Sequence, residues 1–299
     1  MRCPLPRQSD PRSRSGTRKS ALVATVVAGA VLLSGCGAEL QRGYLPEPVT
    51  EIGPRVVGFW NWTWVAALAI GVLVWGLTLW CIVAYRRRKG DDTLPEQFRY
   101  NVPIEILYTV VPILMVLVLF GQTVKLQNDM LDTTQEPDVV VNVVGKVWSW
   151  DFNYVNENVH VAGTQATELS KGEPGVRETL PTLVLPVDSR IEFQLTSRDV
   201  IHSFWVPQFL QKLDMIPGRV NVFQVTTTEE GSFDGKCAEF CGTYHSQMLF
   251  RVDVVSQEEY EQFIAGLEEQ GNTGLLDNGL NVYDLVPGME GYDLRGRDN

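Results

Sequence analysis

The amino-acid sequence predicts an N-terminal two-helix transmembrane hairpin followed by an all-β extracytoplasmic domain, a β-sandwich or barrel. Two long apolar runs, at residues 59–85 and 102–124, come first, and a region in which apolar and polar residues alternate follows from residue 138. An apolar run of about 20 residues is long enough to cross a bilayer. Alternation with a period of two, interrupted by Gly and Pro turns, is typical of the strands of a sandwich or barrel.

Residues 1–35 have the pattern of a lipoprotein signal peptide. Six basic residues among the first 19 precede an apolar stretch that ends in Leu33-Ser34-Gly35-Cys36. Small residues before a cysteine at this place predict cleavage, with Cys36 as the first residue of the mature chain and its lipid acceptor. An uncleaved anchor or a plain signal peptide would fit the same apolar stretch. Residues 36–58 are then an exported linker.

The hairpin is predicted at residues 59–126, with residues 86–101 as a cytoplasmic loop. Three tryptophans mark one end of the first span and four basic residues mark the other: Trp60, Trp62, Trp64, Arg86, Arg87, Arg88 and Lys89. Basic residues flank membrane spans on the cytoplasmic side, and tryptophans gather at the interfaces. Both ends of the hairpin therefore lie outside. Pro112, inside the second run, is tolerated in membrane helices.

Glu105 lies on the first turn of the second predicted span, at its cytoplasmic end. An ionisable residue in a span is a candidate for a functional role. A glutamate near a helix N-terminus is also stabilised by the helix dipole. From the residues alone, this interfacial role is the simpler interpretation.

The β domain is predicted at residues 127–269, with strands at residues 138–144, 148–154, 182–187, 190–196, 220–226 and 248–254. Ser256 and Glu259 have the pattern of a capping box and predict a final helix to about residue 269. Residues 156–181 form a long polar insertion, in which His160 is expected to be exposed to solvent. Residues 270–299 are expected to be a loose tail or a segment that clasps a partner.

Charge is distributed unevenly along the chain. Residues 128–299 contain 28 Asp and Glu against 11 Lys and Arg, a net charge of −17. Such a surface excludes nucleic acid as a partner, because nucleic acid attracts basic surfaces. It favours a basic partner that approaches under electrostatic steering, although solubility of an exported domain would explain the same excess.

Cys237, Cys241, His245 and Met248 lie within twelve residues of one another. Soft sulfur ligands together with imidazole select copper. The second cysteine goes beyond a single blue-copper site and indicates a binuclear, mixed-valence centre with bridging thiolates. Two alternatives remain open at this point, a disulfide between the cysteines and a structural zinc site. Zinc would leave Met248 unexplained, and a disulfide would leave both His245 and Met248 unexplained.

Further ligands must come from elsewhere in the chain, which contains only three histidines. Outside the loop, His202 is the more plausible ligand, because His160 lies in the polar insertion. A weak oxygen donor could be the backbone carbonyl of Glu239, between the two cysteines. With these groups, each copper ion would have one imidazole, which strengthens the copper interpretation.

The sequence resembles subunit II of the bacterial haem–copper cytochrome c oxidases. The resemblance rests on Cys237-x-Glu239-x-Cys241-x-x-x-His245-x-x-Met248 and on two further segments: His202-Ser203-Phe204-Trp205-Val206-Pro207 and Asp214-Met215-Ile216-Pro217-Gly218-Arg219. It covers about residues 59–269, including the hairpin, and implies a cupredoxin-like Greek-key β domain. Quinol-oxidising relatives lack the copper ligands, so the motif is specific.

The resemblance implies a role for each matching residue. The binuclear CuA centre would be bound by His202, Cys237, the Glu239 carbonyl, Cys241, His245 and Met248. The Glu239 side chain resembles the one that faces a magnesium ion shared with subunit I. Trp148 resembles the residue that receives the electron from cytochrome c. Glu105 resembles the glutamate at the mouth of a proton channel, which reverses the interpretation drawn from the residues alone.

The implied function is electron transfer from a cytochrome c through CuA to haem a of subunit 1, for O2 reduction coupled to proton pumping. The implied membrane partners are oxidase subunits 1 and 3. The implied electron donor is cytochrome c or the cytochrome c subunit of a bc complex. The second donor is included because the lipobox, the insertion and the tail resemble actinobacterial forms, whose oxidase associates directly with the bc complex. No Cys-x-x-Cys-His motif occurs, so the donor haem belongs to another protein. Ser149 and Asn153 depart from the family pattern, and donor docking is expected to differ accordingly.

Two rival functions remain at this level. The first is a membrane-tethered copper carrier or assembly module without an oxidase partner, for which one anchor would suffice. The second is an exported β domain with a Cys237–Cys241 disulfide and no redox metal.

Overall fold

The computed structural model describes residues 37–87, 90, 94, 96–166 and 179–280. The predicted signal peptide and Cys36 lie outside the described residues, as do Arg88, Lys89, the middle of the insertion and the tail from residue 281. Helix α2 (Gly37–Gln41) belongs to an N-terminal unit that ends at Leu45. The hairpin and the β domain belong to the second unit.

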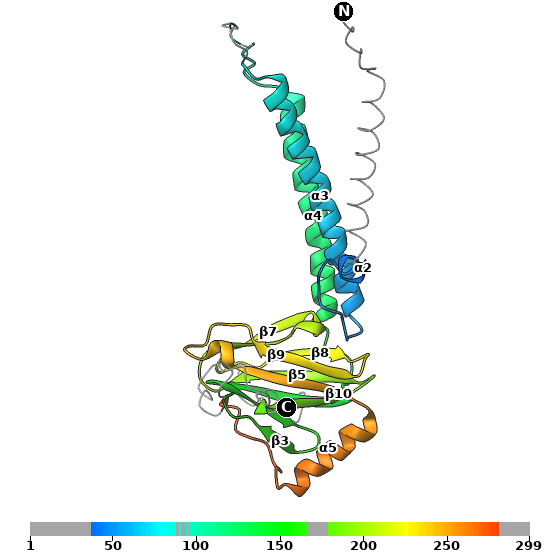
Figure 1. The fold of residues 1–299 in the computed structure, drawn as a ribbon, viewed down its shortest axis with the longest axis vertical. Coiled ribbons are helices and arrows are strands. Elements are labelled where there is room, and N and C mark those ends of the chain that lie inside the picture. Colours follow the sequence, from blue (N-terminus) through cyan, green and yellow to red (C-terminus); the bar gives the residue numbers. More distant parts are fainter. Residues whose placement is uncertain (1–36, 88–89, 91–93, 95, 167–178, 281–299) are drawn as a thin grey trace, which may run out of the picture. The chain divides into compact units, whose positions relative to one another are not determined.

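Two long helices form the predicted hairpin, and Figure 1 shows them side by side. They are α3 (Gly53–Ala84) and α4 (Val102–Met130). At 1.5 Å per residue they are about 48 Å and about 44 Å long, which exceeds the ~30 Å hydrocarbon core of a bilayer. Both continue about six residues beyond the predicted spans at their outer ends. There Arg55 of α3 forms an ion pair with Asp129 of α4, which lets polar turns extend past the apolar region.

Helix α4 begins with a polar cap. The Asn101 side chain accepts a hydrogen bond from the Ile104 amide at 3.4 Å. In return, Oε1 of Glu105 accepts one from the Asn101 amide at 2.8 Å. Such reciprocal bonds satisfy amides that a helix N-terminus leaves without partners. Glu105 therefore has at least the structural role that its position predicts.

The β domain is a sandwich of two five-stranded sheets (Figure 1). The first sheet has the order β3 (Val159–Ala162), β2 (Ser149–Tyr154), β1 (Val139–Lys146), β5 (Arg190–Ser197) and β8 (Asn221–Thr226). The second has the order β4 (Thr182–Pro186), β10 (Leu249–Val255), β9 (Gly231–Cys237), β6 (His202–Val206) and β7 (Gln211–Met215). The β1–β5 and β4–β10 pairs are parallel, and the other pairs are antiparallel.

Aromatic side chains from both sheets fill the space between them. In β2, alternate residues Trp150, Phe152 and Tyr154 are fully buried, and Phe250 of the facing sheet packs on the first two. Because strand side chains alternate between faces, the residues between them point away from this core. Helix α5 (Gln257–Glu269) follows the last strand and begins with the predicted Ser256–Glu259 capping box.

The structure confirms the predicted fold class and adds four strands that the sequence patterns did not indicate, β3, β6, β7 and β9. Strand β3 lies in the polar insertion and pairs with β2. The expectation that His160 is solvent-exposed is wrong, because it is half-buried in β3 and its Nδ1 lies 2.9 Å from the Gly274 carbonyl oxygen. Pairing with a sheet edge overrides the polar composition of this segment.

The described part of the C-terminal segment is not a loose tail. Thr273 pairs with Val159 in an isolated bridge, and the Leu276 backbone is hydrogen-bonded to the side chain of Asn153. Its backbone polar groups thus find partners on the first sheet. Residues 281–299 lie outside the description.

Candidate metal centre

The fold brings two distant segments of the chain together at one end of the sandwich. Strand β9 ends at Cys237, β10 begins at Leu249, and the connecting loop closes through a 3.0 Å hydrogen bond from the Cys237 amide to the Met248 carbonyl. Strand β6, which begins at His202, pairs with the end of β9. The loop is fixed to β6 by the Ala238 amide, which donates to the Ser203 carbonyl at 3.0 Å. His202 therefore lies beside the cysteine loop although 35 residues separate it from Cys237.

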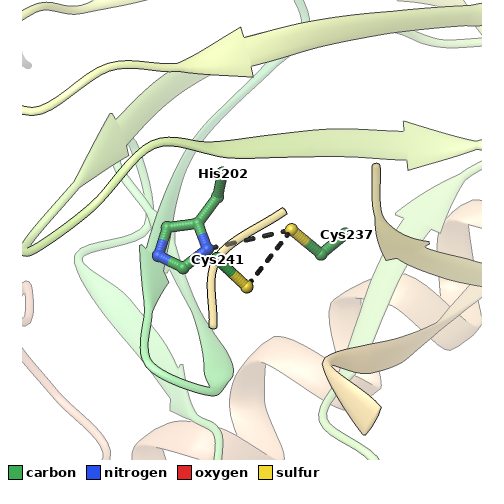
Figure 2. Close-up of side chains that lie close together, drawn as sticks. All are labelled: His202, Cys237 and Cys241. Atoms are coloured by element: carbon green, nitrogen blue, oxygen red, sulfur yellow. Dashed lines mark hydrogen bonds between the residues drawn. The ribbon is translucent and has the colours of Figure 1, made fainter. Parts of the chain in front are cut away.

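The side chains of His202, Cys237 and Cys241 form one cluster, shown in Figure 2. Their donor atoms all lie within 4.8 Å of one another. The two sulfur atoms are 3.9 Å apart, and Nδ1 of His202 lies 3.8 Å from Sγ of Cys237. A disulfide bond is about 2.05 Å long, so the cysteines are present as free thiols.

The remaining predicted donors join this cluster. Nδ1 of His245 lies 3.5 Å from Sγ of Cys241, and Sδ of Met248 lies 3.8 Å from the same sulfur. The Glu239 carbonyl oxygen is 3.2 Å from Sγ of Cys237. The structure thus places all six predicted donor groups together, with one imidazole beside each cysteine.

These donors lie at distances that suit metal binding by both cysteines. Metal–thiolate and metal–imidazole bonds are about 2.3 Å and about 2.0 Å long. The sulfur–sulfur separation of 3.9 Å is short enough for one ion to bind both thiolates. Met248 is fully buried within the donor set. A soft thioether beside two thiolates and two imidazoles favours copper over zinc.

Most of the donor set is shielded from water. Cys237 and Cys241 are 5% and 6% exposed, and the side chains of His202 and Met248 are fully buried. Gly145 of β1 permits this close packing, because a Cβ atom there would lie 2.9 Å from Cδ2 of His202. Exclusion of water and fixed ligands are what a resident cofactor requires, whereas ready exchange of the metal needs an open site.

Asp199 orients the His202 ring, a role that sequence reasoning did not assign. Its Oδ1 lies 2.8 Å from Nε2 of His202, and its carboxylate also accepts hydrogen bonds from the amides of Val147 and Val200, both at 2.7 Å. An Nε2–H donated to Asp199 leaves Nδ1 as the free lone pair, on the side of Cys237. Carboxylates that bond the far nitrogen of a ligand histidine fix its tautomer in this way. Its position three residues before His202 was the available signal.

The pKa values of the two thiols are shifted in opposite directions. Burial tends to raise the pKa of Cys237, but its hydrogen bond with His202 brings that pKa below the ordinary value. Burial and the nearby charge of Cys237 raise the pKa of Cys241 to about 12. Burial tends to lower the pKa of His202, but the Asp199 carboxylate raises it on balance. Without metal, the site therefore retains protons that metal binding must displace.

Trp148, the predicted site of electron uptake, contacts the metal loop directly. Its indole Nε1–H donates to the Cys241 carbonyl at 3.2 Å, and its ring meets Tyr244 edge to face with centroids 4.9 Å apart. Gly242, at φ +120°, lies beneath the indole, where a Cβ atom would be 3.2 Å from Cζ2 of Trp148. A glycine is needed for both reasons. The half-buried tryptophan thus joins the surface to a ligand residue.

Glu105 is remote from this centre. It lies at the start of α4, whereas Met130 at the other end accepts a 3.3 Å hydrogen bond from Gln211 of β7. Met130 follows Glu105 by 25 positions, which corresponds to about 37 Å of helix. Glu105 and the β domain that carries the metal donors therefore lie at opposite ends of the hairpin.

Comparison with known proteins gives the same division into two parts. Residues 42–124 match the family described as "Cytochrome C oxidase subunit II, transmembrane domain", and residues 139–255 match "Cytochrome C oxidase subunit II, periplasmic domain". The probable cytochrome c oxidase subunit 2 of Streptomyces avermitilis is 44% identical to this chain and covers 92% of it and 95% of its own length. The chain belongs to the cytochrome c oxidase subunit II family.

A further member of the subunit II family matches over most of the chain. Cytochrome c oxidase subunit 2 of Mycobacterium tuberculosis is 37% identical, over 83% of this chain and 82% of its own length. Among solved structures, the periplasmic domain of subunit II of cytochrome oxidase (CoxB) of Bradyrhizobium japonicum is 29% identical, with a TM-score of 0.41, and covers 46% of this chain and 99% of its own.

Family membership establishes the broad function. This subunit II is a membrane protein with two spans and an extracytoplasmic β domain, and it is a component of an oxidase with other subunits. The family implies copper, and the cluster of His202, Cys237 and Cys241 is a group suited to hold a metal.

Proposed function

We propose that this subunit receives electrons from a cytochrome c at a binuclear CuA centre and passes them to haem a of subunit 1, where O2 is reduced and protons are pumped. The observation that carries the proposal is the convergence of six donor groups, two free thiols 3.9 Å apart and four further soft or neutral donors around them. The donors are His202, Cys237, the Glu239 carbonyl, Cys241, His245 and Met248.

The chain's own residues supply position and environment. A copper pair bound there would supply one-electron chemistry, with the charge shared across two thiolates. Strands β6, β9 and β10 hold the donors at fixed distances, and burial excludes water from the sulfur atoms. Asp199 keeps the His202 tautomer that presents Nδ1. A protein adjusts the reduction potential of such a centre by holding the ligands rigidly and by hydrogen bonds to the ligand residues.

Trp148 is the proposed point of electron uptake, because its indole reaches from the surface to the Cys241 backbone. The donor is proposed to be cytochrome c or the cytochrome c subunit of a bc complex. The net charge of −17 over residues 128–299 would steer a basic donor toward this domain. Subunits 1 and 3 of the oxidase are the proposed membrane partners.

Three further roles are proposed from the resemblance. The exposed Glu239 carboxylate would take part in a magnesium site shared with subunit 1. Glu105, at the inner end of α4, would lie at the mouth of a proton channel, and its bond to Asn101 holds it at the helix start. Cys36 would carry a lipid anchor, which mass spectrometry of the mature N-terminus can test.

The decisive experiment measures metal content and spectra of the purified oxidase. Two copper ions per subunit II chain and a mixed-valence EPR and near-infrared signature are expected. His202→Ala and Met248→Ala should alter or abolish that signature, because each removes one donor from a buried set. Cys81→Ser is the matched thiol control, since Cys81 is exposed on helix α3, and it should leave the signature unchanged.

Other outcomes would point to the rival functions. One zinc ion per chain and no mixed-valence signal would contradict the proposal in favour of a structural zinc site. Copper that exchanges readily, in a chain that purifies without haem a, would indicate a carrier or assembly module. The buried ligands argue against such a carrier.

A further inference from the structure

Residues 272–280 form a strap across the outer face of the first sheet. The strap begins beside β3, where the His160 amide donates to the Asn272 carbonyl at 3.0 Å and the Gly274 amide donates to the Asn158 carbonyl at 2.7 Å. The bridge between Thr273 and Val159 continues this pairing. The strap therefore starts as an added edge segment of the sheet.

A buried asparagine fixes the middle of the strap. Asn153 of β2 is fully buried, and its side chain makes two hydrogen bonds to the backbone of Leu276, from Nδ2 to the carbonyl at 3.0 Å and to Oδ1 from the amide at 2.8 Å. Nδ2 of Asn153 also donates to Oδ1 of Asn142 at 3.1 Å, and Asn142 in turn donates to the Gln194 carbonyl. Without the strap, the Asn153 side chain would lose two of its hydrogen bonds.

An ion-pair network connects the end of the strap to the loops around the metal centre. Asp277 lies 3.7 Å from Arg198, and Arg198 lies 3.6 Å from the buried carboxylate of Asp151. The same carboxylate accepts from Nζ of Lys146 at 2.6 Å. Gly279, at φ +76°, approaches so closely that a Cβ atom there would lie 2.9 Å from Cα of Arg198.

Both ends of this network adjoin residues of the candidate site. The Arg198 amide donates to the Gly145 carbonyl at 3.0 Å. The next residue, Asp199, is hydrogen-bonded to His202. Lys146 precedes Val147 and Trp148, and Asp199 accepts from the Val147 amide. The strap thus contacts Arg198, while Asp199 connects the tryptophan loop to the ligand histidine.

We infer that residues 272–280 are a positioning element that holds residues 146–148 and 197–202, and through them Trp148 and His202, in place. This deepens the proposed function and rests on it for the copper readout only. The ion pair of Asp277 and Arg198 is partly exposed and contributes little alone. The buried Asn153 amide and the close approach of Gly279 supply the fixed contacts.

Two truncations of the full chain, assembled in the oxidase, test this inference. Removal of residues 272–299 deletes the strap, and removal of residues 281–299 leaves every strap contact described above. The first readout is hydrogen–deuterium exchange, which does not depend on copper. We expect about tenfold or faster exchange in peptides covering 146–148 and 197–202 only when the strap is deleted. Peptides from β10, in the opposite sheet, should be unchanged, which separates local loosening from unfolding.

The second readout is the midpoint potential and EPR hyperfine splitting of the copper centre, which should shift with the longer truncation alone. Asp277→Asn should raise exchange in 197–202 to a smaller degree, and it remains informative if the longer truncation does not fold. Unchanged exchange in both loops, or equal effects of the two truncations, would overturn the inference. Altered exchange without any copper signal would contradict the proposed function while leaving the positioning role in place.

Discussion

At the scale of single residues, Trp148 has one polar contact with the metal loop, its hydrogen bond to the Cys241 carbonyl. Trp148→Phe removes that bond and keeps an aromatic ring. We expect electron uptake from the donor to slow about tenfold, which corresponds to about 1.4 kcal/mol in the barrier, with copper content unchanged. Stopped-flow reduction of the oxidase measures the rate. The control is Trp205→Phe, because Trp205 of β6 packs against Lys236 of β9. Equal rates for the unchanged protein and both variants would refute the role of Trp148.

Cys241 makes copper uptake depend on pH. Its pKa of about 12 in the metal-free site means that the thiol is protonated at neutral pH, and binding as a thiolate releases that proton. Apparent copper affinity should therefore rise about tenfold per pH unit between about pH 7 and about pH 9. The raised pKa of His202 adds a second displaced proton at lower pH, so the slope should steepen there. Chelator competition at fixed free copper measures this, and a flat profile would contradict it.

At the scale of secondary-structure elements, the sequence predicted the strands, helices and metal loop that have a clear pattern within one segment of the chain. Six strands follow from the alternation of apolar and polar residues, and both spans follow from long apolar runs. Five of the six metal donors lie within twelve residues of one another. Strand β9 was missed because Gly231–Cys237 contains two glycines and three exposed polar residues, so only its pairing with β10 and β6 makes it a strand. The strap, and the bond from the Val147 amide to Asp199, depend on contacts between distant segments, which no spacing in the sequence reveals.

Two glycine-to-alanine changes are expected to have opposite effects on stability, because the space around the added methyl group differs. A Cβ at Gly235 of β9 would lie 2.1 Å from ring atoms of the fully buried Phe250, so Gly235→Ala should lower the free energy of unfolding by about 1–3 kcal/mol. Gly266 of α5 has no atom within 4 Å of that position, and Gly266→Ala should raise stability by up to about 1 kcal/mol. Thermal unfolding of the two variants should shift in opposite directions. A shift in the same direction would show that the Phe250 contact does not decide the outcome.

At the scale of the whole molecule, the metal centre gathers three strands and the connecting loop of one sheet, while the strap anchors loops of the other. The donors come from the start of β6, the end of β9 and the loop before β10. Binding of a metal to these residues is available only in the folded state, because the unfolded chain does not bring His202 to the cysteines. Copper binding is therefore coupled to the stability of the β domain.

Copper removal should destabilise the β domain. A ligand present at 1,000 times its Kd stabilises the folded state by about 4 kcal/mol, which corresponds to roughly 10 °C in the Tm of a domain of this size. Calorimetry of the full chain in detergent, with copper and after chelation, should show this difference in the β-domain transition. Cys237→Ser removes one shared thiolate from the buried donor set and should abolish the copper-dependent shift. If the chelated and loaded proteins unfolded at the same temperature, the donors could not be binding copper in the folded domain.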